Sequence, residues 1–313
     1  MAADFDLLVL GDANPDLVLH GGDVVPAFGQ AEHLVESAHL TVGGSGAILA
    51  CGAVKLGLRV AICAVVGDDL FGRFMRERLE AGGVDAAGLV IDAAIPTGIT
   101  VVLSGPEDRA ILKMPGTIAA LRADLVDRSL LERARHVHVS SYYLQTGLVP
   151  SLPELFEQVH GGGGTTSIDP NWDPSGAWDG GLTELLRATD VFLPNAMEAT
   201  RMAHTSDLEG AVRSLATRSD LVVVKNGDHG ALAARQGKLH RVAGVSTDVV
   251  DTTGAGDSFD AGFLAAWLRG EAVERALAIA NACGALSARA MGGIDAQPTM
   301  EEALDVIEQG SAA

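Results

Sequence analysis

The chain has 313 residues, and its 22 Lys and Arg against 41 Asp and Glu give a formal net charge of −19. This excess of acid argues against a protein that binds nucleic acid through a basic face, and against one that binds an anionic membrane surface. Apolar residues make up 48% of the chain and charged residues 20%, which is typical of a globular protein. The length allows one large α/β domain or two small ones.

Three cysteines, Cys51, Cys63 and Cys283, lie in apolar stretches. An odd number without paired spacing predicts buried free thiols in a reducing compartment rather than disulfides or a zinc site. The N-terminus has neither the basic region nor the cleavage site of a signal peptide, and no apolar run approaches the ~20 residues that cross a bilayer. We therefore expect a cytoplasmic protein with no membrane partner.

Short apolar runs alternate with longer amphipathic segments along the chain. The predicted buried strands are Leu7–Leu10, Val60–Val66, His136–Ser140, Thr166–Ile168, Val191–Leu193 and Leu221–Val224. The predicted helices are Gly46–Leu56, Leu70–Ala81, Ala123–Arg133, Leu182–Ala188 and Glu209–Arg218. This alternation predicts an α/β fold with a doubly wound, mostly parallel sheet and helices on both faces.

Two stretches, Asp16–Leu40 and Thr97–Met114, show strand-like alternation with no helix between the strands. Within the second, an apolar run, a turn at Gly105-Pro106 and a second run predict a β-hairpin. The two stretches are expected to form a small separate sheet, a lid over one edge of the main sheet that closes on a ligand.

The segment Asp251–Phe259 reads DTTGAGDSF and lies between an apolar pair, Val249-Val250, predicted as a strand, and a predicted helix, Phe259–Leu268. Small residues at such a turn let backbone N–H groups converge on an anion at the positive end of the helix. Asp257 lies beside that anion hole, where a carboxylate suits a general base acting on a hydroxyl that attacks phosphorus. The alternative is that Asp257 is a helix N-cap and the glycines form a tight turn.

The segment Asp251–Leu264 resembles the C-terminal signature of the ribokinase (PfkB) family of carbohydrate kinases. Gly43-Gly44-Ser45-Gly46, with Gly57 and Gly67, resembles the N-terminal signature of the same family. The resemblance implies one ribokinase-like kinase domain over residues 1–313, with lid segments at about 12–42 and 96–118. It also implies an ATP-dependent phosphotransferase that uses Mg²⁺ and phosphorylates a hydroxyl of a sugar or sugar-like small molecule.

By the same resemblance, Asp257 is the catalytic base, and the anion hole is formed by Gly254, Ala255 and Gly256. The residues implied to bind the acceptor are Asn14, Asp16, Gly43, Gly44 and Ser45. Those implied to bind the nucleotide are Lys225, Gly227 and Asn281. Asn195 and Glu198 match a motif that organises Mg²⁺, largely through water, and Asp251 and Thr253 match positions that help hold a monovalent cation such as K⁺ in some members.

Several of these residues also have a purely structural interpretation. Asp16 suits a turn after the first strand, and Gly43-Gly44 suits a tight turn into a helix. Asn195 and Glu198 suit a helix N-terminus with an acid in its first turn. Segment 169–171, an Asp-Pro-Asn run, either faces the same cleft or is a simple turn.

The chain departs from the family pattern at the acceptor site. Ile48 stands where the first signature normally has Asn, and Ser45 where the ribokinase branch has Lys. Tyr142 and Tyr143 stand where that branch supplies a sugar-binding Glu, and they are either core residues or a stacking surface for a flat ligand. Two alternatives to a sugar kinase therefore stay open: a nucleoside kinase of the same fold, and a catalytically weak ligand-binding regulator.

The assembly is not fixed by the sequence. The apolar lid residues Val18, Leu34 and Ile99 are compatible with a homodimer formed through the lid. No nucleic-acid or membrane partner is expected.

Overall fold

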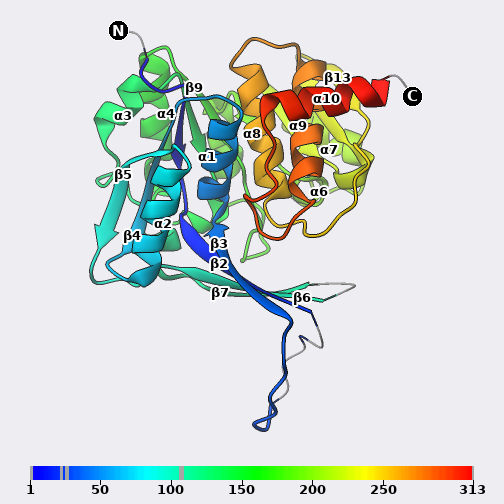
Figure 1. The fold of residues 1–313 in the computed structure, drawn as a ribbon. Helices are drawn as coiled ribbons and strands as arrows, with labels where there is room; N and C mark the ends of the chain where they lie inside the picture. Colours follow the sequence, from blue (N-terminus) through cyan, green and yellow to red (C-terminus); the bar gives the residue numbers. More distant parts are fainter. Residues whose placement is uncertain (1–2, 22–23, 25–27, 106–108, 312–313) are drawn as a thin grey trace.

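The computed structural model describes residues 3–21, 24, 28–105 and 109–311. In this part of the chain a nine-stranded sheet lies between two layers of helices, and a four-stranded sheet lies beneath it in the view of Figure 1. This is the α/β arrangement, with a second small sheet, that the alternation of the sequence predicts.

The large sheet has the strand order β13-β12-β11-β10-β9-β8-β1-β4-β5. Its strands are β1 (Leu7–Leu10), β4 (Val60–Gly67), β5 (Asp85–Asp92), β8 (His136–Val139), β9 (Thr165–Ile168), β10 (Val191–Phe192), β11 (Leu221–Lys225), β12 (Ala231–Arg235) and β13 (Lys238–Val242). The strands from β5 to β11 pair in parallel, and β12 and β13 pair antiparallel at the other edge.

Each face of the large sheet carries its own buried apolar cluster. Alternate residues of β1 supply both, with Leu7 and Val9 on one face and Leu8 and Leu10 on the other. The first face is covered by α1 (Ser45–Lys55), α2 (Leu70–Ala81), α8 (Ala255–Trp267), α9 (Val273–Ser287) and α10 (Met300–Ser311). The second face is covered by α3 (Arg128–Arg133), α4 (Leu152–Gly161), α5 (Leu182–Leu185), α6 (Ala196–Met202) and α7 (Leu208–Leu215).

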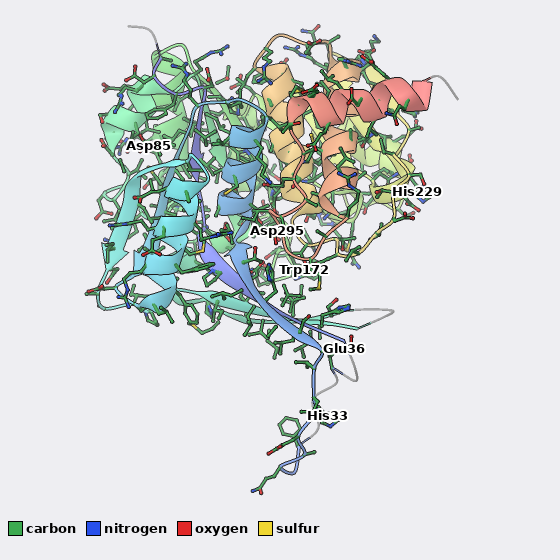
Figure 2. All side chains as sticks on the ribbon, in the orientation of Figure 1. His33, Glu36, Asp85, Trp172, His229 and Asp295 are labelled. Carbon is green, nitrogen blue, oxygen red and sulfur yellow. The ribbon has the colours of Figure 1, made fainter. Side chains whose placement is uncertain are left out.

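The small sheet, called the lid below, has the order β3-β2-β6-β7. Its strands are β2 (Asn14–His20), β3 (Ser37–Gly43), β6 (Ile99–Ser104) and β7 (Arg109–Met114). They come from the two stretches predicted to form a separate sheet. The exposed segment before β3 extends away from the body, with His33 and Glu36 along it (Figure 2). A hydrogen bond of 3.0 Å between His39 Nε2 and Asp295 Oδ2 ties β3 to the loop before α10.

Several predicted boundaries are wrong. The helix predicted from Ala123 begins only at Arg128, because the Asp127 carboxylate accepts a hydrogen bond from the Ser129 N–H and caps it there. The helix predicted over Leu182–Ala188 splits into α5 and one 3₁₀ turn, and the helix predicted to Arg218 ends at Leu215. The 3₁₀ segments are Gly116–Ala119, Tyr142–Leu144, Val149–Ser151, Leu186–Ala188 and Gly227–His229.

The predicted strand at Val249-Val250 is also wrong. Both residues lie in an irregular segment, and they are 61% and 53% exposed. The Gly-Ala-Gly turn is therefore reached from a loop, not from a strand. The helix that follows it, α8, begins at Ala255, four residues earlier than predicted.

Candidate active site

The turn before α8 is shaped by a glycine that no other residue replaces without strain. Gly254 has φ of 72°, and a Cβ added there would lie 2.8 Å from Gly293 Cα and 2.9 Å from Ile48 Cγ2. Ala255 then begins α8, so the first N–H groups of the helix, which have no acceptor within it, lie at this turn. The turn therefore presents N–H groups and the positive end of a 13-residue helix to any anion beside it.

One cavity, the acceptor cavity, lies between the lid, the start of α1 and this turn. Its volume is about 150 Å³. It is lined by Asp16, Gly44, Ser45, Ile48, Thr100, Val102, Ile111, Lys113, Thr253, Gly254 and Asp257. Five of the residues that the sequence predicts to bind acceptor or catalyse thus come together from three separate parts of the fold: Asp16, Gly44, Ser45, Gly254 and Asp257.

Asp257 lies in the first turn of α8 with its carboxyl in a strongly perturbed environment. Burial and the negative charges of Asp169 and Asp12 raise its pKa to about 8, although Lys225 and a hydrogen bond with Ser45 act in the opposite direction. A carboxyl with such a pKa holds its proton more tightly than an exposed aspartate does. Its ionised form is correspondingly the stronger base.

Asp16 is held on β2 by neighbouring polar groups. Asn14 Nδ2 donates to Asp16 Oδ1 (3.4 Å) and to Thr100 Oγ1 (3.3 Å). Burial raises the pKa of Asp16 to about 6, while Thr100 and Lys113 act to lower it. Gly43 leaves the room for this carboxylate, because a Cβ there would lie 2.1 Å from it. Asn14 and Gly43 therefore support Asp16 from outside the lining of the acceptor cavity.

Three further polar residues fix the start of α1. Sequence analysis did not place Asp12 and Ser141 in the site, whereas Asn171 belongs to the segment 169–171, for which a position in the cleft was left open. Asp12 Oδ1 accepts from the Gly46 N–H (3.0 Å) and from Ser141 Oγ (3.4 Å). Asn171 Nδ2 donates to Ser141 Oγ (2.9 Å) and to Ser45 Oγ (3.3 Å). Asp12 was detectable in principle, because it follows the first strand directly, where parallel sheets place ligand-binding residues.

A second cavity, the nucleotide cavity, lies on the other side of the same turn. Its volume is about 310 Å³, at the lower end of the range for small-molecule sites. All three residues predicted to bind nucleotide, Lys225, Gly227 and Asn281, line it together with Ala255 and Gly256. Apolar walls come from Val245, Val249, Phe259 and Ala285. An apolar slot that ends at a helix N-terminus fits a base and phosphates, so the residues present are compatible with ATP.

Lys225 forms ion pairs with two buried carboxylates, which the sequence did not predict. Its Nζ lies 2.5 Å from Asp169 Oδ2 and 2.9 Å from Asp260 Oδ2. Burial alone would raise the pKa of Asp169, but the Lys225 ammonium holds it below its usual range; burial raises the pKa of Asp260. The cluster joins the ends of β9 and β11 to α8, one turn after Asp257.

Asn195 and Glu198 form a capping box at the start of α6. Glu198 N–H donates to Asn195 Oδ1 (2.9 Å), and Asn195 N–H donates to Glu198 Oε2 (2.8 Å). Burial and the Asp169 charge raise the pKa of Glu198 to about 7. The structural interpretation of this pair is thus confirmed. Over the described residues, no group of three or more His, Cys, Asp or Glu is arranged to hold a metal ion directly.

Asp251 braces the loop that carries the turn. Its Oδ1 accepts from the N–H (2.9 Å) and the Oγ1 (2.7 Å) of Thr253, and its Oδ2 accepts from the Gly292 N–H (3.0 Å). This bracing keeps the loop close to Gly293. A cation role for Asp251 and Thr253 stays a prediction.

The family of the chain follows from its match to the sequence model of a known protein family. The model of the pfkB family carbohydrate kinases matches residues 4–300. The chain belongs to the pfkB family of carbohydrate kinases. The predictions of family, ribokinase-like fold and kinase class are therefore confirmed.

Similar proteins support the same family. The chain is 33% identical over 298 residues to an ATP-dependent ribose-1-phosphate kinase of Halopiger xanaduensis, covering 94% of this chain and 95% of that one. It is 31% identical over 273 residues to a fructokinase of Salmonella typhimurium, covering 82% of this chain and 88% of that one. A putative ribokinase II from E. coli, solved with ATP and Mg²⁺, superposes with a TM-score of 0.86 at 26% identity and covers 97% of this chain and 99% of that chain.

Two of the departures from the family pattern can now be placed in the structure of this pfkB kinase. Tyr142 and Tyr143 belong to a core cluster and do not line the acceptor cavity. Ile48 lines that cavity and contacts the turn at Gly254, so it forms an apolar wall where the family pattern has an amide.

Two further predictions concern the chain as a whole. Cys51, Cys63 and Cys283 are buried free thiols, and burial raises the pKa of each, to about 11 for Cys51 and about 12 for the other two. In the part of the chain that the structure describes, no helix is long and apolar enough to span a bilayer.

Proposed function

We propose that this pfkB kinase transfers the γ-phosphoryl group of ATP to a hydroxyl of a sugar or sugar-like molecule in the acceptor cavity. One observation carries the proposal: the two cavities meet at the first turn of α8. Gly254 and Asp257 line the acceptor cavity, and Ala255 and Gly256 line the nucleotide cavity. A group that moves from one cavity to the other therefore passes the N–H groups of this turn.

Asp257 is the proposed general base. Its carboxylate accepts the proton of the acceptor hydroxyl as that oxygen forms its bond to phosphorus. The N–H groups at Gly254 and Gly256 stabilise negative charge on the group in transfer, in a position fixed before the ligands arrive. The Ala255 N–H donates to the Thr252 carbonyl oxygen (3.2 Å) and shapes the turn. ATP supplies the phosphoryl group, and Mg²⁺ neutralises charge on its phosphates.

The binding roles follow the lining of each cavity. Asp16 accepts hydrogen bonds from acceptor hydroxyls, supported by Asn14 and Gly43 behind it. Gly44 and Ser45 close the same cavity at the start of α1. On the nucleotide side, Gly227 and Asn281 face the base and ribose, and Lys225 fixes the floor beneath the phosphates.

The cation roles rest on oxygen ligands. Glu198 is proposed to reach Mg²⁺ through water, which suits a hard cation that keeps part of its hydration shell. Asn195 orients Glu198 through the capping box. Asp251 and Thr253 are proposed to hold K⁺ at the loop that they brace.

The identity of the acceptor follows from the relatives and from the lining of the cavity. The relatives named above are described as acting on a sugar phosphate in one case and on a neutral sugar in another. An adenosine kinase of Sinorhizobium meliloti superposes with a TM-score of 0.84, but at 22% identity this likeness shows the fold alone. We propose a sugar-like acceptor because Tyr142 and Tyr143, the residues suited to stack on a base, are buried away from the cavity.

The test is ADP release from ATP and Mg²⁺ over a panel of pentoses, hexoses, sugar phosphates, keto-deoxy acids and nucleosides. The Asp257→Asn variant is the blank, and Asp85→Asn, on the distant edge strand β5 (Figure 2), is the matched control. We expect one acceptor class to give ADP release that Asp257→Asn loses and Asp85→Asn keeps. Ligand-induced stabilisation without any ADP release would instead favour the regulator.

Three further properties of the chain are proposed: its domain organisation, its assembly and its location. The chain is proposed to fold as one domain over residues 1–313, because both layers of helices pack on one sheet. A homodimer through the lid is proposed from its exposed apolar residues Leu34, Leu40 and Leu112. Of the other residues that the sequence suggested for this contact, Ile99 is half-buried and Val18 is fully buried, so Val18 is not available to a partner. A cytoplasmic location is proposed from the three free thiols. Sedimentation of the protein tests the dimer.

A further inference from the structure

Lys113 lies at the end of a polar row that crosses the lid on the side of the acceptor cavity. The register pairs Thr41 with Asp16, Asp16 with Thr100, and Thr100 with Lys113. Residues directly opposite each other in neighbouring strands carry their side chains on the same face of a sheet. Lys113 therefore shares its face with Asp16, and both line the acceptor cavity.

The charge on Lys113 has no ion-pair partner among the described residues. Asp16 acts on it only at longer range, and no carboxylate described in the structure comes within ion-pair distance. Among the described residues that line the acceptor cavity, Lys113 is the one basic side chain, whereas Asp16 and Asp257 are acidic. Lys113 is exposed, so its positive charge is open to a ligand that enters the cavity.

Apolar side chains line the acceptor cavity beside Lys113. The next row of the lid contributes Val102 and Ile111 to the lining, and Ile48 faces them from α1. Val102 and Ile48 are buried, whereas Ile111 is 53% exposed and Lys113 itself is exposed, so a ligand in the cavity can reach the ammonium. Lys113 lies on β7, an edge strand of the lid, and Asp257 lies on α8, so an acceptor can present an anion to one and a hydroxyl to the other.

We propose that the acceptor is an anionic sugar, a phosphate ester or a sugar acid, and that Lys113 is the residue that selects it. This inference rests on the proposed function, since it assigns an anion-binding role to the Lys113 end of the same acceptor cavity. Lys113 donates to the anion, while Asp16 accepts from a neighbouring hydroxyl. The reacting hydroxyl is then the one remote from the anion.

The test separates binding from turnover. Calorimetry without ATP compares three matched probes, ribose, ribose 1-phosphate and ribonate, on the wild-type protein, on Lys113→Met and on Lys113→Arg. Lys238→Met, at an exposed lysine on β13, is the matched control. ADP release with ATP and Mg²⁺ is then measured for the same proteins and probes.

We expect an anionic probe to bind at least about 10-fold more tightly than ribose. Lys113→Met should weaken its binding by about 10- to 100-fold, Lys113→Arg should retain most of it, and Lys238→Met should not change it. Tighter binding of ribose 1-phosphate than of ribonate would identify the acceptor as a phosphate ester. Tighter binding of ribonate would identify it as a sugar acid. Equal binding of ribose and both anions, or equal losses for all three in Lys113→Met, would overturn the proposal.

The second readout distinguishes this proposal from the proposed function. Selective, Lys113-dependent binding without ADP release would keep the anion subsite and refute the kinase activity at this site. ADP release with ribose that is as efficient as with either anion, and equally sensitive to Lys113→Met, would keep the kinase and refute the selection of an anion.

Discussion

Replacing Lys225 with Met is expected to destabilise the fold more than any change to a surface lysine. Lys225 Nζ contacts Asp169 at 2.5 Å and Asp260 at 2.9 Å, and Asp260 is fully buried. The Met variant leaves two carboxyl groups in the interior without their cation. Removing one partner of a buried ion pair typically costs about 3–5 kcal/mol of unfolding free energy, and we expect a loss of that size at pH 8.

The loss should depend on pH in a defined direction. In the variant, burial without the ammonium raises the pKa of both carboxyls, whereas in the unfolded chain they ionise near pH ~4. A carboxyl whose pKa is raised by folding costs stability as the pH rises above its unfolded pKa. The destabilisation should therefore be smaller at pH 5 than at pH 8.

Urea unfolding of the wild-type protein and Lys225→Met at both pH values provides the measurement. Lys238→Met, which removes an exposed lysine paired with Glu274, is the control and should leave the unfolding free energy nearly unchanged. The double variant Lys225→Met/Asp260→Leu should recover part of the loss, because it also removes one unpaired carboxyl. A loss below about 1 kcal/mol at pH 8, or one that grows towards pH 5, would refute the view that this cluster is a buried ion pair.

Two further predictions concern the turn and its carboxyl. Since burial raises the pKa of Asp257 to about 8 and the base must be deprotonated to act, kcat/KM should rise with pH and level off above about pH 8; a flat profile from pH 6 to 9 would count against Asp257 as the base. Gly254→Ala should lose about 1–2 kcal/mol from its left-handed backbone and lose kcat because its Cβ meets Gly293 and Ile48. Gly237 has φ of 77° and open space where a Cβ would lie, so Gly237→Ala should lose similar stability but keep its kcat. Equal kcat in Gly254→Ala and Gly237→Ala would show that the turn before α8 tolerates displacement.

The parts of the site that the sequence predicted are those encoded within a short segment. The Gly254–Asp257 turn is such a segment, because a helix start and the carboxyl beside it are set by neighbours along the chain. The lid was also predictable, since alternation in β2, β3, β6 and β7 differs from the continuous apolar runs of the parallel strands. The polar row that ends at Lys113 depends on strand register, which the sequence alone did not supply.

The parts that were missed depend on contacts across the chain. Lys225 meets Asp169 and Asp260 over separations of 56 and 35 residues, so only the folded sheet brings the three together. Val249-Val250 was predicted as a strand because it is apolar and β-branched, but Val249 lines the nucleotide cavity instead of pairing. Strand propensity does not distinguish an apolar residue in a strand from one that is exposed to line a ligand cavity.

Phosphate transfer from labelled ATP to the acceptor found in the panel, by the wild-type protein and Asp257→Asn, tests the central claim most directly. Calorimetry with ATP and with that acceptor establishes that the variant still binds both. The account predicts retained binding and transfer lowered by about 10²–10⁴-fold, as expected for loss of a general base. An Asp257→Asn variant that binds both ligands and transfers phosphate at close to the wild-type rate would contradict it.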